Sequence, residues 1–226
     1  MTDMEHDIKK KLIKTAKNIY KDEPSGHDFG HVERVLNYCK LIHNNEGGNW
    51  NVIFVSALFH DVHRVMQSKI GTYVSPEESI TEVKKVLEEF KQFFSEEEYD
   101  KILNNIKLHE DKRIKIYNNI ELVILQDADL LDALGKNGLK RTKKYCKYHN
   151  IPFYDPEPLN SPDYIVDIHP ISTSHFLFRT LIPQYDLLRT KTSQQIADKD
   201  KKLLYEFIED QKRLYSQSLI IGKKQS

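Results

Sequence analysis

The chain has 226 residues, which is enough for one domain of ordinary size or for one domain with an elaborated end. Its 34 Lys and Arg balance its 34 Asp and Glu, and this zero net charge argues against a dedicated nucleic-acid-binding protein. The longest apolar stretch, residues 52–59, is too short to span a membrane, and no secretory signal opens the sequence. Two distant cysteines, Cys39 and Cys146, indicate neither a disulfide framework nor a zinc ribbon. We therefore expect a cytoplasmic protein.

The first half of the chain shows helical periodicity. Apolar residues recur at steps of three and four over residues 32–42 and again over 80–90, which predicts two amphipathic helices. The stretch 52–59 is apolar on every side, and this pattern favours a helix at the centre of a bundle. A buried strand is the alternative for so short a run, but no neighbouring strand signals accompany it.

Two later helices carry start signals. Ser95 with Glu98 matches a capping box ahead of an apolar stripe, and Thr192 with Gln195 suggests another that opens a long final helix. Between these helices, five prolines fall within residues 150–170 and predict a loop, which is either an active-site flap or a connector.

These signals predict an all-α fold, a compact helical bundle. We expect a single domain over residues 1–226, with a core at about 20–215. The proline-rich loop occupies 150–170, and a frayed tail occupies 220–226.

Three segments place ionisable side chains in apolar surroundings. One histidine leans inward in the first turn of the helix over 32–42, a His-Asp pair ends the apolar helix, and three aspartates lie within the apolar segment 124–135. Taken alone, the first histidine could be a capping or core residue, and the histidine of the pair could be a cation stabilised by the helix C-terminus. The alternative for the three aspartates is a salt-bridged structural cluster. Taken together, two imidazoles and two carboxylates from three helices suit a divalent metal, because buried charges need partners. This ligand set is His31, His60, Asp61 and Asp127.

The ordered pattern of His, His-Asp and Asp resembles the HD superfamily of metal-dependent phosphohydrolases. The match is closest to small bacterial HD hydrolases, on the strings HDFGHVERV at 27–35 and QDADLLDALGKNGLKR at 126–141, and it extends over roughly 20–215. The resemblance implies the same four metal ligands. It also implies a divalent ion, with Mn²⁺ as the first choice and Mg²⁺, Fe²⁺, Co²⁺ or Ni²⁺ as alternatives.

The remaining site residues follow from the same resemblance and from their positions. Arg64 stands where some nucleotidase relatives carry a carboxylate, and we expect it to hold a substrate phosphate. His109 continues an apolar stripe inward, where it would contact phosphate or, as a second choice, ligate a second metal; a core histidine is the alternative. Arg141 closes the signature and is expected near a phosphate, within an otherwise solvated basic run. Asp132 or Asp129 would orient the ligands. The expected catalytic residues are Asp61, Arg64, His109 and Asp132.

The resemblance implies a metal-dependent phosphohydrolase that acts on a small phosphate ester or anhydride, with a nucleotide as the first choice. Two further departures, Leu130 and Asp200 in place of the usual arginines, leave substrate choice open. The alternatives are a non-catalytic nucleotide sensor, a di-metal oxygenase and, last, a structural interaction protein. Neither a nucleic-acid polymer nor a membrane is expected as a partner, and a homodimer is left open.

Overall fold

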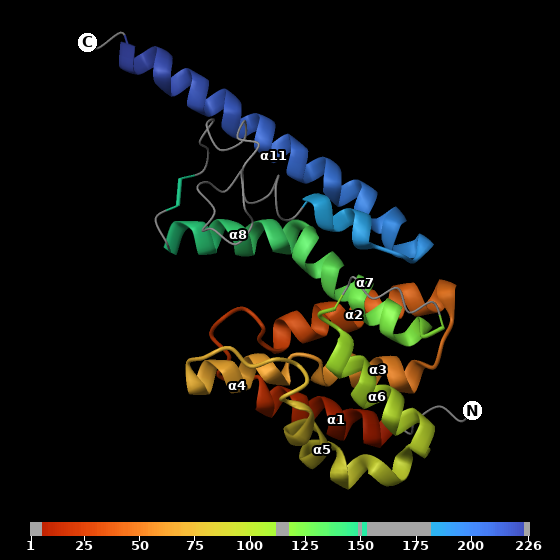
Figure 1. Cartoon of the computed structure of the whole chain (residues 1–226). Coiled ribbons are helices and arrows are strands. Elements are labelled where there is room, and N and C mark those ends of the chain that lie inside the picture. Colours follow the sequence, from red (N-terminus) through yellow and green to blue (C-terminus); the bar gives the residue numbers. More distant parts are fainter. Residues whose placement is uncertain (1–5, 112–117, 149–150, 153–181, 224–226) are drawn as a thin grey trace. The chain divides into compact units, whose positions relative to one another are not determined.

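All regular secondary structure in the described part of the chain is helical. This computed structural model describes residues 6–111, 118–148, 151–152 and 182–223. Within these residues there are nine α-helices, two short 3-10 helices and no strand, which confirms the all-α prediction (Figure 1). The elements are α1 His6–Ile19, α2 Phe29–Glu46, α3 Trp50–Phe59, α4 Val62–Ile70, α5 Ile80–Leu87, η1 Glu88–Phe93, α6 Glu96–Leu108, α7 Ile120–Leu134, α8 Lys136–Tyr148, η3 Ile182–Leu187 and α11 Lys191–Lys223.

The chain divides into two compact units. The first comprises the described residues of Met1–Asp132 and Arg189–Ser193, and the second those of Ala133–Leu188 and Gln194–Ser226. The expectation of one domain over the whole chain stays a prediction. Apart from residues 151–152, the expected proline-rich loop lies outside the described residues.

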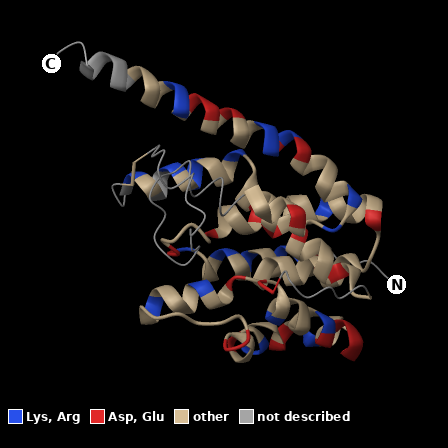
Figure 2. Cartoon of the chain, turned by 45° about the horizontal axis from the view of Figure 1, so that its top comes forward, with Lys and Arg blue, Asp and Glu red and all other residues tan. Residues whose placement is uncertain are grey.

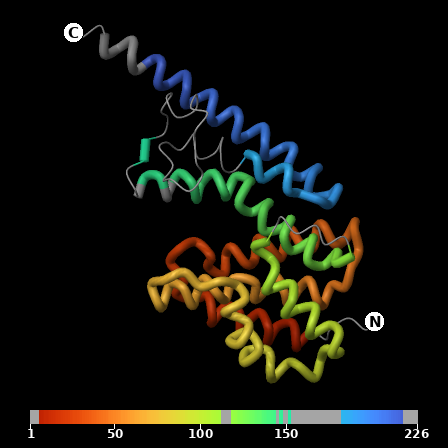
Figure 3. Tube along the Cα trace, in the orientation of Figure 1, coloured from red at the N-terminus to blue at the C-terminus, as the bar shows by residue number. Residues whose placement is uncertain are grey.

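The first unit is built around α3. Every residue from Val52 to Phe59 is buried, because α3 packs against α1, α2 and α6 (Figure 3). Residues such as Leu12, Leu58 and Ile106 form one continuous apolar core with it. The apolar run therefore forms the predicted central helix, and its carboxyl end delivers the His-Asp pair into the interior.

The two predicted capping boxes have different outcomes. The Ser95 side chain accepts from the Glu98 amide while Glu98 binds back to the Ser95 amide, so this capping box is confirmed. The prediction at Thr192 is wrong. Its amide and hydroxyl both donate to Glu46, and the helix start is instead capped by Thr190, whose hydroxyl accepts from the Ser193 amide at 3.2 Å.

The second unit contains α8, η3 and most of α11. The Tyr185 hydroxyl donates to the Leu134 carbonyl, and Lys143 lies 4.3 Å from the centre of the Phe207 ring. Acidic and basic side chains alternate along α11, as on a solvated helix (Figure 2). This helix reaches Lys223 and so continues into the segment expected to be a tail. Nowhere in the described residues is a helix both long and apolar enough to cross a bilayer.

Candidate metal centre

His31 is fixed by contacts on two sides. The Asp28 side chain caps α2 by accepting from the His31 amide, which places the residue in the first turn. Its ring Nδ1 donates to Asp132 Oδ2 at 2.8 Å, and Arg34 Nε binds the other oxygen of Asp132 at 2.6 Å. Asp132 therefore lies behind His31 and orients the ring, leaving Nε2 to face the interior.

His60 and Asp61 follow directly after α3 and meet His31. The His60 ring donates from Nδ1 to the Ala57 carbonyl at 2.9 Å, so its Nε2 also presents a lone pair. The two Nε2 atoms lie 3.2 Å apart, and Asp61 Oδ2 lies 3.2 Å from His31 Nε2 and 3.3 Å from His60 Nε2. Asp129 Oδ1 completes this first donor group at 3.5 Å from His31 Nε2.

The first donor group fits a cation. His31, His60 and Asp61 are 1%, 0% and 3% exposed, and Asp61 Oδ2 has no hydrogen-bond partner. Burial lowers the pKa of His31, but hydrogen bonds to Asp132 and Asp61 outweigh it and raise the pKa to about 9. Burial raises the pKa of Asp61, but His60, His109 and His31 together hold it well below its usual range. The raised pKa of His31 shows that this group attracts positive charge, and imidazole with carboxylate suits a divalent metal in place of the proton.

The structure does not bring Asp127, an expected ligand, into this group. Both Asp127 oxygens accept from the amino end of α11: from the Thr190 amide and hydroxyl at 2.8 Å each, from the Ser193 hydroxyl at 2.6 Å and from the Arg189 amide at 3.1 Å. Its lone pairs are thus occupied in anchoring that helix. Asp129, expected only to orient ligands, lies with His31 and His60 in a group that could hold a metal ion.

A second donor group surrounds the other oxygen of Asp61. His109 Nε2 lies 3.6 Å from Asp61 Oδ1, His63 Nδ1 lies 4.0 Å from it, and all three side chains are buried. The His109 ring donates from Nδ1 to the Ile106 carbonyl at 2.7 Å, and burial lowers its pKa. A neutral ring in this tautomer offers a lone pair at Nε2 and no proton. His109 as it lies can therefore ligate a metal but cannot donate to the phosphate it was expected to contact.

Arg64, the expected phosphate clamp, is held by a carboxylate that the sequence did not reveal. Its Nη2 binds Glu110 Oε1, and the same oxygen lies 3.2 Å from His63 Nε2. Burial alone would raise the pKa of Glu110, but the hydrogen bond with His63 and the charge of Arg64 outweigh burial and lower the pKa to about 2. Glu110 is therefore ionised at neutral pH.

Two further residues, Gln126 and Arg189, support the site and were not predicted from the sequence. Gln126 donates to the carbonyls of Leu108 and Asp111 at 2.7 and 3.0 Å and so fastens the turn that carries His109 and Glu110. Its oxygen accepts from Arg189. Gln126 is the first residue of the QDAD string, and this string was the one sequence signal that could have indicated its role. The Arg189 contact spans 63 residues and has no local signature.

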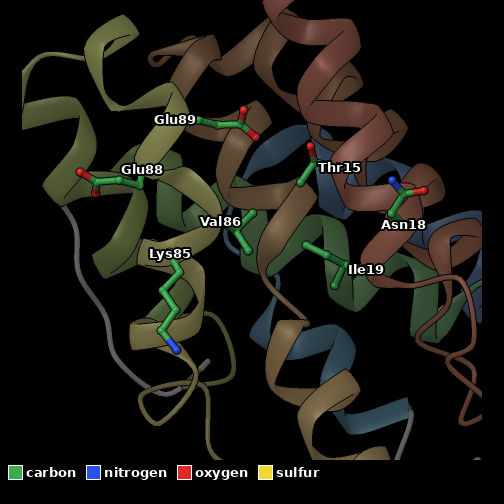
Figure 4. A pocket seen from close by; sticks show the side chains of 7 residues that line it. All are labelled: Thr15, Asn18, Ile19, Lys85, Val86, Glu88 and Glu89. Carbon is green, nitrogen blue, oxygen red and sulfur yellow. The ribbon is translucent and has the colours of Figure 1, made fainter.

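Arg141 and a surface pocket belong to other elements than those that carry the donor groups. Arg141 lies in α8, within the second unit, and its expected phosphate contact stays a prediction. A surface pocket of about 610 Å³ is lined by α1, α5 and η1, with Thr15 and Glu89 facing it (Figure 4). None of its lining residues belongs to either donor group, so this pocket is not the metal centre.

The segment that carries both donor groups matches known proteins. Residues 28–134 match the family model of the HD domain. An HD-superfamily hydrolase from Bacillus thuringiensis has a crystal structure that matches with a TM-score of 0.71 and 28% identity, covering 93% of this chain and 97% of that one. The uncharacterized protein YpgQ of Bacillus subtilis is 25% identical over 198 residues, 85% of this chain and 86% of YpgQ. The YpgQ structure in complex with ADP matches in fold, with a TM-score of 0.67, 19% identity and coverage of 92% and 94%.

The helical bundle contains buried imidazole and carboxylate groups that could hold a metal ion. Residues 28–134 of the chain match the HD domain, and both donor groups are built on this matched segment. HD domains bind divalent metals, and the family and these relatives support a metal-dependent hydrolase.

Proposed function

We propose that this protein is a metal-dependent phosphohydrolase that acts on a small phosphorylated substrate, with a nucleotide as the first choice. The observation that carries the proposal is the convergence of His31 Nε2, His60 Nε2 and Asp61 Oδ2 within 3.3 Å of one another. With each histidine bonded through its Nδ1, these three atoms face one another and attract positive charge, as the raised pKa of His31 indicates. A divalent cation is the ligand that satisfies all three.

In this proposal His31, His60, Asp61 and Asp129 hold the metal, with Asp129 in the place first given to Asp127. A bound divalent cation supplies Lewis-acid chemistry and lowers the pKa of water at the site. Asp132 keeps His31 in the ligating tautomer through the 2.8 Å bond to Nδ1. Arg64 supplies positive charge for the phosphoryl oxygens, as a planar donor that matches phosphate.

The nucleotide is supported by a relative. YpgQ of Bacillus subtilis has been solved in complex with ADP. The donor set agrees with such a ligand, because carboxylate and imidazole bind the metals that accompany phosphates, Mn²⁺ foremost. The base and the number of phosphates are to be determined by a screen of nucleotides.

The second donor group favours one further candidate, a two-metal centre bridged by Asp61. A di-metal oxygenase needs more histidine ligands than the sequence pattern offers, and His63 and His109 supply two at Asp61 Oδ1. Metal analysis separates the arrangements, because the first donor group alone predicts one ion per chain and both groups predict two. Oxygen consumption in place of phosphate release would identify the oxygenase.

A phosphate-release screen tests the function. The purified protein, stripped with a chelator and resupplied with Mn²⁺, is assayed for release of phosphate and pyrophosphate from nucleoside mono-, di- and triphosphates. We expect at least one substrate to turn over, with activity lost in chelator and regained with metal. Nucleotide binding by calorimetry without any turnover would instead identify a non-catalytic sensor.

A further inference from the structure

The guanidinium of Arg64 is occupied before any substrate arrives. Arg64, near the start of α4, binds Glu110 through Nη2 and lies 3.5 Å from Gln67 through Nη1. The Arg64 and Glu110 side chains are 25% and 29% exposed, so a solute can reach the pair. Each residue directly follows a histidine of the second donor group. The pair therefore lies just outside the metal centre, where the phosphate of a metal-bound substrate would come.

The Glu110 carboxylate opposes the binding of an anion at Arg64. Because the Glu110 carboxylate is paired with Arg64, a phosphate that approaches Arg64 meets a like charge as well as the guanidinium. The substrate can engage Nη2 fully only by displacing the carboxylate from it.

The turn that carries Glu110 is anchored, whereas Arg64 is a long and partly exposed side chain. Gln126 holds the carbonyls on both sides of Glu110, at Leu108 and Asp111. His63 Nε2, at 3.2 Å, gives the carboxylate a second partner that remains when Arg64 leaves. The exchange is therefore a movement of the Arg64 side chain alone.

We propose that Glu110 competes with the substrate phosphate for Arg64 and thereby sets the affinity of the site for phosphorylated ligands. This inference rests on the proposed function of Arg64. The exchange is energetically easy, because a partly exposed ion pair contributes little to stability, whereas a guanidinium binds phosphate through paired, charge-assisted hydrogen bonds. Glu110 is thus an affinity-determining residue that opposes binding.

Calorimetric titration of the Mn²⁺-loaded protein with inorganic pyrophosphate tests the competition. Glu110→Gln keeps an oxygen acceptor for His63 but removes the charge, and it should bind pyrophosphate about fivefold more tightly than wild type. Arg64→Ala should bind at least about tenfold more weakly. The matched control is Glu77→Gln, which removes an exposed carboxylate paired with Lys107 of α6 and should leave the affinity unchanged.

The double variant Arg64→Ala, Glu110→Gln separates competition from simple repulsion. If Glu110 acts by competing for Arg64, the gain in pyrophosphate affinity from Glu110→Gln disappears once Arg64 is removed. The double variant then binds pyrophosphate with the same affinity as Arg64→Ala. A gain that persists there, unchanged or weaker binding by folded Glu110→Gln with normal metal content, or no pyrophosphate binding by wild type would each overturn the inference. A protein that shows the predicted gain yet releases no phosphate from any nucleotide keeps the inference and rejects hydrolysis.

Discussion

Asp61→Asn is expected to abolish metal binding and phosphate release together. Asp61 is the one carboxylate whose two oxygens face both donor groups, with Oδ2 near His31 and His60 and Oδ1 near His109. The amide removes the negative charge and turns one donor atom into an N–H group that repels a cation. We expect metal affinity to fall by at least about 100-fold, beyond the loss typical of residues that only orient a ligand.

Metal content after dialysis and phosphate release are measured on Asp61→Asn and on a control, Asp100→Asn, which changes an exposed aspartate of α6. The control should match wild type in both measurements. Stoichiometric metal and full activity in folded Asp61→Asn would show that the catalytic centre lies elsewhere.

The substitutions Asp127→Asn and Asp129→Asn are expected to separate stability from metal binding. Asp127 accepts from Thr190 and Ser193 at the start of α11, so the asparagine places an N–H group against buried donors. We expect a loss of about 3 kcal/mol in the free energy of unfolding, with metal binding retained. Asp129, whose side chain is 18% exposed, should show the reverse: little loss of stability without metal, and much weaker metal binding.

Urea unfolding of the chelator-treated proteins gives the first quantity, and Mn²⁺ titration gives the second. Each variant serves as the control of the other, because both remove one carboxylate from the same helix. If Asp127→Asn loses metal while keeping wild-type stability, Asp127 is the ligand and its contacts with α11 are secondary.

The sequence could predict which residues enter the interior but could not tell Asp127 from Asp129. Residues two apart on a helix point roughly 200° apart, so only one of them can face a given partner. The segment around them is buried on nearly every side, from Leu122 to Leu131, and therefore lacks the polar face that would show its orientation. The orientation depends on α2, which brings His31 to Asp129, and on the start of α11, which occupies Asp127.

Contacts between segments that are far apart in the sequence could not be predicted from local patterns either. The apolar helix α3 and its terminal His60 and Asp61 could be predicted, because the residues that are buried on all sides of α3 form one short apolar stretch of sequence. The pairing of Arg64 with Glu110 spans 46 residues, and neither residue has a neighbouring motif that indicates it. Arg64 could thus be recognised as a phosphate-binding residue type, but not as one already paired with a carboxylate.

Titration of chelator-stripped protein with Mn²⁺, followed by both melting temperature and phosphate release, tests the metal centre most directly. Metal that binds only the folded protein stabilises it by about 2.7 kcal/mol at a hundredfold excess over the dissociation constant. We predict that the melting temperature and the hydrolysis rate rise together over the same range of metal concentration, and that His60→Ala shows neither rise. Hydrolysis that persists in the stripped protein, or a rise in melting temperature that His60→Ala retains in full, would contradict the account.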